Sequence, residues 1–203
     1  ELNPIPYSDS LIEVLQGIPH VTHVSTFVSK PGIIKTDSAF QGIVFKGTDY
    51  WDYFTQNLME GALPQNTNEV LISTELANQL QLQVGENFLC YFIQENLRVR
   101  RFYIAGLYNT CMSELDKLFI LGDIDVVRQL NAWQDNQASG IEILVDDLRH
   151  LDATTHAVYF ATANRLSESG EAYYTQNLEQ LNPNIFGWLD LLDMNVVIII
   201  VLM

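Results

Sequence analysis

The chain has 203 residues, of which 48% are hydrophobic and 17% are charged, so it is long and apolar enough to bury a core. Its 25 acidic residues and 10 lysines and arginines give a formal net charge of -15 at pH 7. A surface this acidic repels phosphate backbones, which excludes a nucleic-acid partner. The scarcity of basic residues also fits a segment outside the cytoplasm, because lysine and arginine collect on the cytoplasmic side of membranes.

The first quarter of the chain alternates helical and extended patterns. Apolar residues at helical spacing predict a short helix from Leu11 to Ile18, and Pro19 ends it. The sequences Val21–Ser29 and Gln41–Lys46 predict strands. Between them, Lys30-Pro31-Gly32 predicts a turn that interrupts the first strand.

A dense aromatic group follows the second of these strands. It consists of Tyr50, Trp51, Tyr53 and Phe54. If these side chains are exposed together, they form a patch that faces a partner or a lipid. Packing into the core is the favoured alternative.

The middle of the chain has the most regular pattern. A short strand, Glu69–Ile72, leads into a helix that Ser73 caps. A hairpin follows, with arms at Asn87–Ile93 and Arg98–Leu107 and a tight polar turn at Gln94–Asn96. The imperfect alternation of the second arm favours a strand that is partly buried on both faces.

The last third again interleaves strands and helices. Strands are predicted at Lys117–Leu121, Ile141–Val145 and Ala172–Thr175. Helices are predicted after Asp123 and after Asp146-Asp147, whose carboxylates cap helix starts. The fold class is therefore α+β or α/β with mixed sheets, and the sequence shows no internal repeat.

The sequence ends in an uninterrupted apolar run that an interfacial tryptophan precedes. A membrane helix needs about 20 apolar residues, and this run has the character of the first part of one. A buried terminal strand is the alternative, because Val and Ile also favour strands. The residues expected at the membrane entry are Trp188, Val196, Val197, Ile198, Ile199, Ile200, Val201, Leu202 and Met203.

No constellation of catalytic residues stands out. His20 and His23 are three residues apart, which in a strand puts them on opposite faces, and His150 and His156 lack a nearby pair of ligands. All four are interpreted as surface or strand-end histidines. Ser73 lies at a strand-to-helix turn without flanking glycines, so capping explains it. The sequence therefore predicts no catalytic residue, no cofactor-binding residue, no cofactor and no metal ligand.

The two cysteines leave the redox compartment open. Cys90 lies in a predicted strand and Cys111 in a predicted loop after the next strand. A disulfide between them would stabilise the fold by roughly 3 kcal/mol. A buried free thiol at Cys90 is an equally acceptable interpretation.

Seven short motifs follow one another along nearly the whole chain. They are Leu15-x-x-Ile18-Pro19-His20-Val21-x-x-Val24, Gly61-Ala62-Leu63-Pro64, Asn68-Glu69-Val70-Leu71-Ile72-Ser73, Leu76-Ala77-Asn78-Gln79-Leu80, Val84-Gly85-Glu86, Phe102-x-Ile104-Ala105-Gly106-Leu107-Tyr108 and Trp188-Leu189-x-x-Leu192-x-Met194-Asn195. Each motif alone is only a strand, turn, cap or helix signature. Their order resembles the MacB-like periplasmic core domain of FtsX/LolE/MacB-type ABC transporter permeases.

The resemblance implies a two-lobed α+β fold. A porter-like βαβ lobe close to the membrane is expected from residues 1–48 and 140–187. A smaller β-rich lobe with mixed sheets is expected from residues 49–139, and a transmembrane helix is expected to start within residues 188–203. Relatives that recruit a periplasmic chaperone carry a projecting hairpin, and the turn at Gln94–Asn96 is too short to form one there.

The resemblance also implies a function. The segment is expected on the extracytoplasmic side of the inner (cytoplasmic) membrane, without catalysis of its own. The expected partners are the membrane, a cytoplasmic ABC ATPase and a second permease copy or homologue. ATP hydrolysis would move or release a hydrophobic substrate such as a lipoprotein, peptide or lipid. The alternative is a membrane-tethered module that binds a protein or cell-envelope ligand, and a hydrolase is disfavoured.

Overall fold

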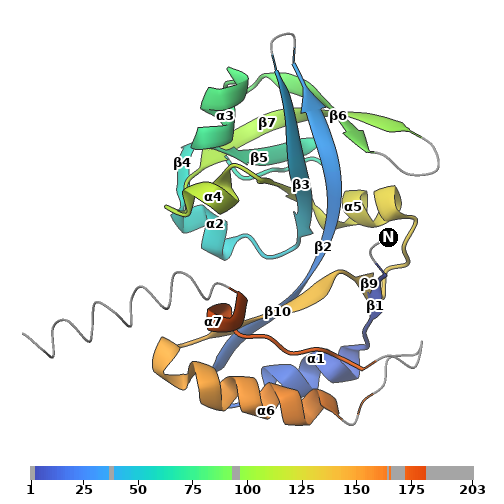
Figure 1. Ribbon diagram of the computed structural model, residues 1–203, viewed down its shortest axis with the longest axis vertical. Coiled ribbons are helices and arrows are strands. Elements are labelled where there is room, and N and C mark those ends of the chain that lie inside the picture. Colours follow the sequence, from blue (N-terminus) through green and yellow to red (C-terminus); the bar gives the residue numbers. More distant parts are fainter. Residues whose placement is uncertain (1–2, 37–38, 93–96, 164, 166–171, 182–203) are drawn as a thin grey trace, which may run out of the picture. The chain divides into compact units, whose positions relative to one another are not determined.

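The computed structural model describes residues 3–36, 39–92, 97–163, 165 and 172–181 (Figure 1). Strands and helices interleave along them, and the main sheet has both parallel and antiparallel neighbours. The predicted α+β class with mixed sheets is therefore confirmed. The chain forms two compact units: unit 1, from Glu1–Ser8 and Val24–Glu142, and unit 2, from Asp9–His23 and Ile143–Met203.

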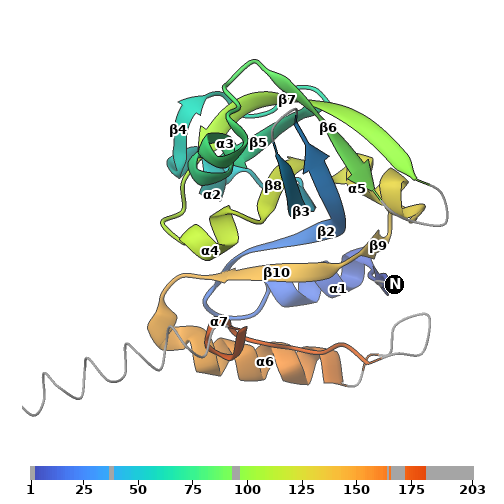
Figure 2. The same cartoon turned by 45° about the horizontal axis from the view of Figure 1, so that its top comes forward.

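Four adjacent strands form the centre of the sheet of unit 1 (Figure 2). In spatial order they are β3 (Phe40–Thr48), β8 (Phe119–Asp123), β5 (Glu69–Ser73) and β7 (Arg98–Tyr108). The outer pairs, β3 with β8 and β5 with β7, are parallel, whereas β8 and β5 are antiparallel. Two further strands, β4 (Leu58–Gly61) and β6 (Asn87–Phe92), pair antiparallel with β7.

Two helices of unit 1 follow β5 and β8 directly and pack into its core. They are α3 (Thr74–Leu80) and α5 (Ile124–Asn131). The Ser73 hydroxyl accepts a hydrogen bond from Leu76 N at 3.0 Å, and the Asp123 carboxylate accepts from Val126 N at 3.2 Å. Both predicted caps are therefore confirmed. The core cluster contains the buried faces of both helices: Leu76, Ala77, Leu80, Ile124, Val126, Val127 and Leu130.

The strand β2 (Val21–Lys35) is continuous, so the turn predicted at Lys30-Pro31-Gly32 is wrong. Pro31 lies opposite Val44 in the antiparallel pair with β3, and this pairing runs through it from Phe27 to Lys35. A Cβ atom on Gly32 would lie 2.9 Å from the Phe92 ring and 3.0 Å from Cys90 Sγ. Glycine at this position makes room for core side chains and does not reverse the chain.

Two of the recognised motifs meet where β4 pairs with β7. Gly61 lies opposite Gly106 and has a φ of 80°, in the left-handed region that favours glycine. A Cβ atom on Gly61 would lie 2.2 Å from the carbonyl oxygen of Ala105. A Cβ atom on Gly106 would lie 2.8 Å from the carbonyl oxygen of Ala62. Both glycines are therefore required for the two backbones to approach.

Short elements complete unit 1. They are β1 (Ile5–Pro6), α2 (Asp52–Gln56), α4 (Ser113–Asp116) and β9 (Gln137–Ala138). β1 pairs with β9 antiparallel. The hydroxyl of Tyr7 donates to the carbonyl of Asp135 at 2.9 Å and accepts from Arg128 Nη2 at 2.8 Å. These bonds hold the start of the chain against the loop after α5.

Unit 2 contains α1 (Asp9–Gln16), η1 (Leu148–His150), α6 (Leu151–Ala163), α7 (Leu178–Leu181), the start of β2 and the second half of β10 (Gly140–Val145) (Figure 2). α1 packs against α6, and buried residues of the two helices include Leu11, Leu15 and Val158. The strand predicted at Ala172–Thr175 is wrong: only Ala172 makes a bridge, and Tyr174 is 83% exposed.

The boundaries of the two units differ from the boundaries expected for the two lobes. Residues 24–48 belong to unit 1, whereas the resemblance placed them with residues 140–187. The physical reason is that β3 pairs with β8 along its whole second half, from Val44 with Phe119 to Thr48 with Asp123. The first strands are thereby part of the sheet built by the middle of the chain.

The expected membrane-entry residues, Trp188 and Val196–Met203, lie outside the described residues, as do Gln94–Asn96 of the hairpin turn. Among the residues that the structure describes, none of the helices has the length and apolar character needed to cross a membrane. The membrane connection remains a prediction from the sequence.

Candidate functional site

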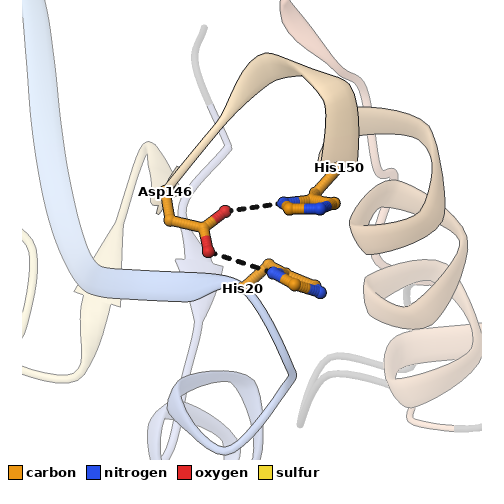
Figure 3. Close-up of side chains that lie close together, drawn as sticks. All are labelled: His20, Asp146 and His150. Carbon is orange, nitrogen blue, oxygen red and sulfur yellow. Dashed lines mark hydrogen bonds and ion pairs between the residues drawn. The ribbon is translucent and has the colours of Figure 1, made fainter.

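Three side chains from two distant parts of the sequence meet in unit 2 (Figure 3). The carboxylate of Asp146 lies between two imidazole rings. Its Oδ2 is 3.0 Å from Nδ1 of His20, and its Oδ1 is 2.9 Å from Nδ1 of His150. The two rings stack with their centroids 3.6 Å apart and an interplanar angle of 23°. We call these three residues the His-Asp-His cluster.

The backbone around each residue explains how the cluster assembles. His20 lies between the end of α1 and the start of β2 with a φ of 68°, which is uncommon for a residue other than glycine. Asp146 follows the last residue of β10, and its N–H donates to the carbonyl of His20 at 3.0 Å. His150 ends η1, four residues after Asp146. Two turns, one after α1 and one after β10, thus carry the three side chains.

The hydrogen bonds from the imidazoles determine the charge of the carboxylate. The bond from His20, followed by that from His150, lowers the pKa of Asp146 to about 2. An ionised carboxylate only accepts hydrogen bonds, so Nδ1 of each ring carries the proton that it donates. The side chains are 41%, 44% and 38% exposed for His20, Asp146 and His150, so ions and water can reach them.

The neighbouring acidic residue has a different partner. Asp147 accepts from the guanidinium of Arg149 and from its backbone N–H at 2.8 Å, and these bonds lower the pKa of Asp147. Asp147 therefore caps η1 as predicted, whereas Asp146, also predicted to cap, does not. The role of Asp146 in holding two histidines was not predicted.

The cluster could not be predicted from the sequence because its members are far apart in the chain. By sequence spacing, His20 is closest to His23, and His150 has no nearby pair of ligands. The only local signal is that Asp146 and His150 are four residues apart, a common spacing on any helix. The turn after α1 lies beside the turn after β10 only because of the tertiary structure of unit 2, which sequence spacing does not indicate.

The aromatic group divides between packed and exposed side chains. Trp51 and Phe54 pack against a buried cluster of unit 1 formed by Leu71, Tyr108 and Leu121. Tyr53 is 44% exposed, and its ring meets that of Phe54 edge to face. Tyr50 is half-buried. The packing of Trp51 and Phe54 agrees with the favoured alternative, and a partner-facing role for the whole group stays a prediction.

The nucleophilic side chains considered in the sequence have structural roles. Ser73 is fully buried, and its hydroxyl donates to the carbonyl of Asp116 while it caps α3. Both cysteines are free thiols. Cys90 is buried, and this burial raises its pKa to about 12, so it holds almost no thiolate at neutral pH.

Comparisons with known proteins give matches in structure alone. No family model matches the chain, and no curated protein matches it in sequence. The extracellular domain of the noncanonic ABC-type transporter YknZ from Gram-positive bacteria is similar, with a TM-score of 0.54 and 13% identity over 85% of this chain and 91% of that one. The periplasmic region of MacB from Actinobacillus actinomycetemcomitans is similar, with a TM-score of 0.54 and 14% identity over 89% and 83%.

The chain has the fold of these transporter domains. The fold expected from the ordered motifs is therefore confirmed, over nearly the whole length of both chains. At 13% and 14% identity the likeness concerns the fold. The transported substrate and the partners of this chain are proposed on the basis of this fold.

Proposed function

We propose that this chain is an extracytoplasmic domain of an ABC transporter permease. The observation that carries the proposal is the fold that it shares with the extracellular and periplasmic domains of YknZ and MacB. The order of the seven sequence motifs and the apolar run Val196–Met203 support the same function. The domain couples cytoplasmic ATP hydrolysis to the movement or release of a hydrophobic substrate such as a lipoprotein, peptide or lipid.

The proposal implies a set of partners and a location. The permease lies in the inner membrane with this segment outside the cytoplasm, and it forms a dimer with a second copy or a homologue. A cytoplasmic ABC ATPase supplies the energy, so the domain itself acts mechanically. The burial of Ser73 in a capping role supports a non-catalytic domain. Residues 1–48 with 140–187, and residues 49–139, are proposed as the two functional lobes.

The exposed thiol of Cys111 allows a direct test of the location. Intact cells or spheroplasts that express the full-length protein are treated with a membrane-impermeant maleimide. We expect labelling at Cys111 before lysis, because the domain faces the outside. The buried Cys90 is an internal control that stays unlabelled until denaturation, and Cys111→Ser should abolish the signal. Labelling of Cys111 only after membrane permeabilisation would refute the proposed location.

A second experiment, with the whole transporter, tests the coupling of ATP hydrolysis to substrate movement. The full-length permease is purified from the membrane and assayed for a co-purifying ABC ATPase and its hydrolysis rate in nanodiscs. A variant in which a short linker replaces residues 5–181 should retain the ATPase but lose substrate-dependent hydrolysis. A permease that purifies without any ATPase would instead favour a membrane-tethered binding module.

A further inference from the structure

We propose that His20, Asp146 and His150 form a binding site for a divalent transition-metal ion of the zinc type. The His-Asp-His cluster offers one ligand atom from each residue, and these atoms all lie within 4.8 Å of one another. Two imidazoles and one carboxylate are a ligand set of catalytic zinc sites, which leave a fourth position for water. The proposal is independent of the proposed transport function, because it rests on unit 2 alone.

The spacing of the donor atoms suits an ion of this size. Zinc bonds of about 2.0–2.2 Å at tetrahedral angles place two ligand atoms about 3.3 Å apart. The two Nδ1 atoms lie 3.0 Å and 2.9 Å from the carboxylate oxygens of Asp146. The three donor atoms lie within 4.8 Å of one another, so movements of at most about 1.5 Å in these partly exposed side chains bring all three to coordination distance of one ion. The rings stack with an interplanar angle of 23°, so the in-plane lone pairs of the two Nδ1 atoms point in similar directions. Rotation of a ring about its side-chain bonds then directs both nitrogens at one ion next to the carboxylate.

The chemistry of the donors selects the class of ion. Imidazole nitrogen favours zinc and its neighbours, whereas magnesium and calcium require oxygen ligands. Binding removes the proton from Nδ1 of each histidine, and each neutral ring then carries its proton on Nε2. The carboxylate changes only its partner, from two N–H groups to the ion. No redox step or other reactant is needed.

The surroundings leave the cluster available to an ion. The three side chains are each close to two-fifths exposed, so a bound ion keeps a path to solvent. The adjacent carboxylate of Asp147 does not compete, because Arg149 occupies both of its oxygens. Asp146 is thus the carboxylate that faces both histidines, and Asp147 provides a matched control one residue away.

A bound ion would act as a clip within unit 2. It would join the turn after α1 to the turn after β10, which are 126 residues apart in the sequence between His20 and Asp146. Links that close long loops stabilise a fold most. Occupancy of the site would therefore raise the melting temperature and hold α1 beside the start of η1.

The test is a titration of the complete, untagged chain with Zn²⁺ by calorimetry, with Mg²⁺ as the negative control. We expect a single zinc ion per chain. His20→Ala, His150→Ala and Asp146→Asn should each weaken zinc binding by at least the about 10–100-fold that loss of a supporting residue typically costs. The control variants His23→Ala, His156→Ala and Asp147→Asn should bind zinc like the unchanged protein.

Two further measurements test the folding of a variant and the protonation of the imidazole nitrogens. Asp146→Asn preserves the shape of the side chain, so circular dichroism of this variant separates a lost ligand from a misfolded chain. In the ¹⁵N spectrum of the imidazoles, zinc should move the proton from Nδ1 to Nε2 in both rings. The proposal is overturned if the zinc affinity of the His20→Ala variant equals that of the unchanged protein. It is also overturned if the Nδ1 protons persist in the zinc-bound state.

Discussion

Leu71 lies opposite Leu121 where β5 and β8 run antiparallel in the centre of the sheet of unit 1. Both leucines are buried in the same small cluster. The two strands have equivalent neighbours in the sheet and along the chain. Each has a parallel outer neighbour, β7 or β3, and each leads directly into a capped helix, α3 or α5. Unit 1 therefore contains a structural repeat of two strand-cap-helix segments.

The repeat was not visible in the sequence because its two copies share few identities. Ser73 caps one helix and Asp123 the other, by the same type of bond to the first turn. Each helix also ends at a residue in the left-handed region, Gln81 with a φ of 56° and Ala132 with a φ of 58°. The pattern of roles is conserved between the two copies, whereas the residue types differ.

We expect the two caps to differ in their contribution to stability. Asp123→Ala should lower the free energy of unfolding by about 1 kcal/mol, the usual value for a lost cap. Ser73→Ala should cost more, roughly 2 kcal/mol or above, because it also leaves the buried carbonyl of Asp116 without its hydroxyl partner. Urea unfolding measures both, and Asp123→Ser, which keeps a capping oxygen, is the control. A smaller loss for Ser73→Ala than for Asp123→Ala would contradict this expectation.

Three glycines should respond to alanine substitution in a fixed order. Gly61→Ala combines a positive φ with a backbone clash and should cost at least about 2 kcal/mol. Gly85→Ala has a positive φ but open space around its Cβ position, and should cost about 1 kcal/mol. Gly42→Ala has neither problem and should be neutral or stabilising by about 0.5 kcal/mol. Chemical denaturation of the three variants gives the order, and equal losses for Gly42 and Gly61 would disprove it.

The two thiols should differ sharply in reactivity. Burial of Cys90 and its pKa of about 12 leave almost no thiolate near pH 8, whereas Cys111 is exposed. Alkylation of the native protein by iodoacetamide should add one group, at Cys111, and denaturant should release the second site. Mass spectrometry of the digested protein measures this. Two groups added at the same rate without denaturant would exclude the buried position of Cys90.

Glu69 should make stability depend on pH in acid. Its carboxylate accepts from the backbone N–H of Gln65 at 2.8 Å and from the side chain of Asn66 at 2.7 Å, which lowers the pKa of Glu69. The stabilising effect is complete above the unfolded pKa of about 4.3 and is lost as the pH falls through the lower folded pKa. Glu69→Gln should therefore be less stable at pH 7 and lose less stability on acidification. Thermal unfolding between pH 7 and pH 2.5 tests this, and parallel curves would argue against it.

Local signals predicted the elements whose causes are local. Ser73 and Asp123 identified two helix starts, and the strand sequences before them identified β5 and β8. Lys30-Pro31-Gly32 wrongly predicted a turn because proline and glycine are typical of turns, whereas glycine can also be required where side chains pack closely. Only the tertiary structure shows that Phe92 and Cys90 occupy the space next to Gly32.

The His-Asp-His cluster could not be predicted from the sequence for a related reason. His20 and His150 stack because the turn after α1 lies beside the turn after β10, and the sequence contains no motif for that proximity. The aromatic group could be predicted in part, since Trp51 and Phe54 pack as the favoured alternative expected.

The parallel pairing of β3 with β8 has a consequence for synthesis on the ribosome. Val44 to Thr48 leave the ribosome long before their partners Phe119 to Asp123. At about 5–20 residues per second, that edge of β3 waits for several seconds without its neighbour. An unpaired strand edge is a template for pairing with another chain. Nascent chains of this protein should therefore be most prone to misassembly in the interval before β8 emerges.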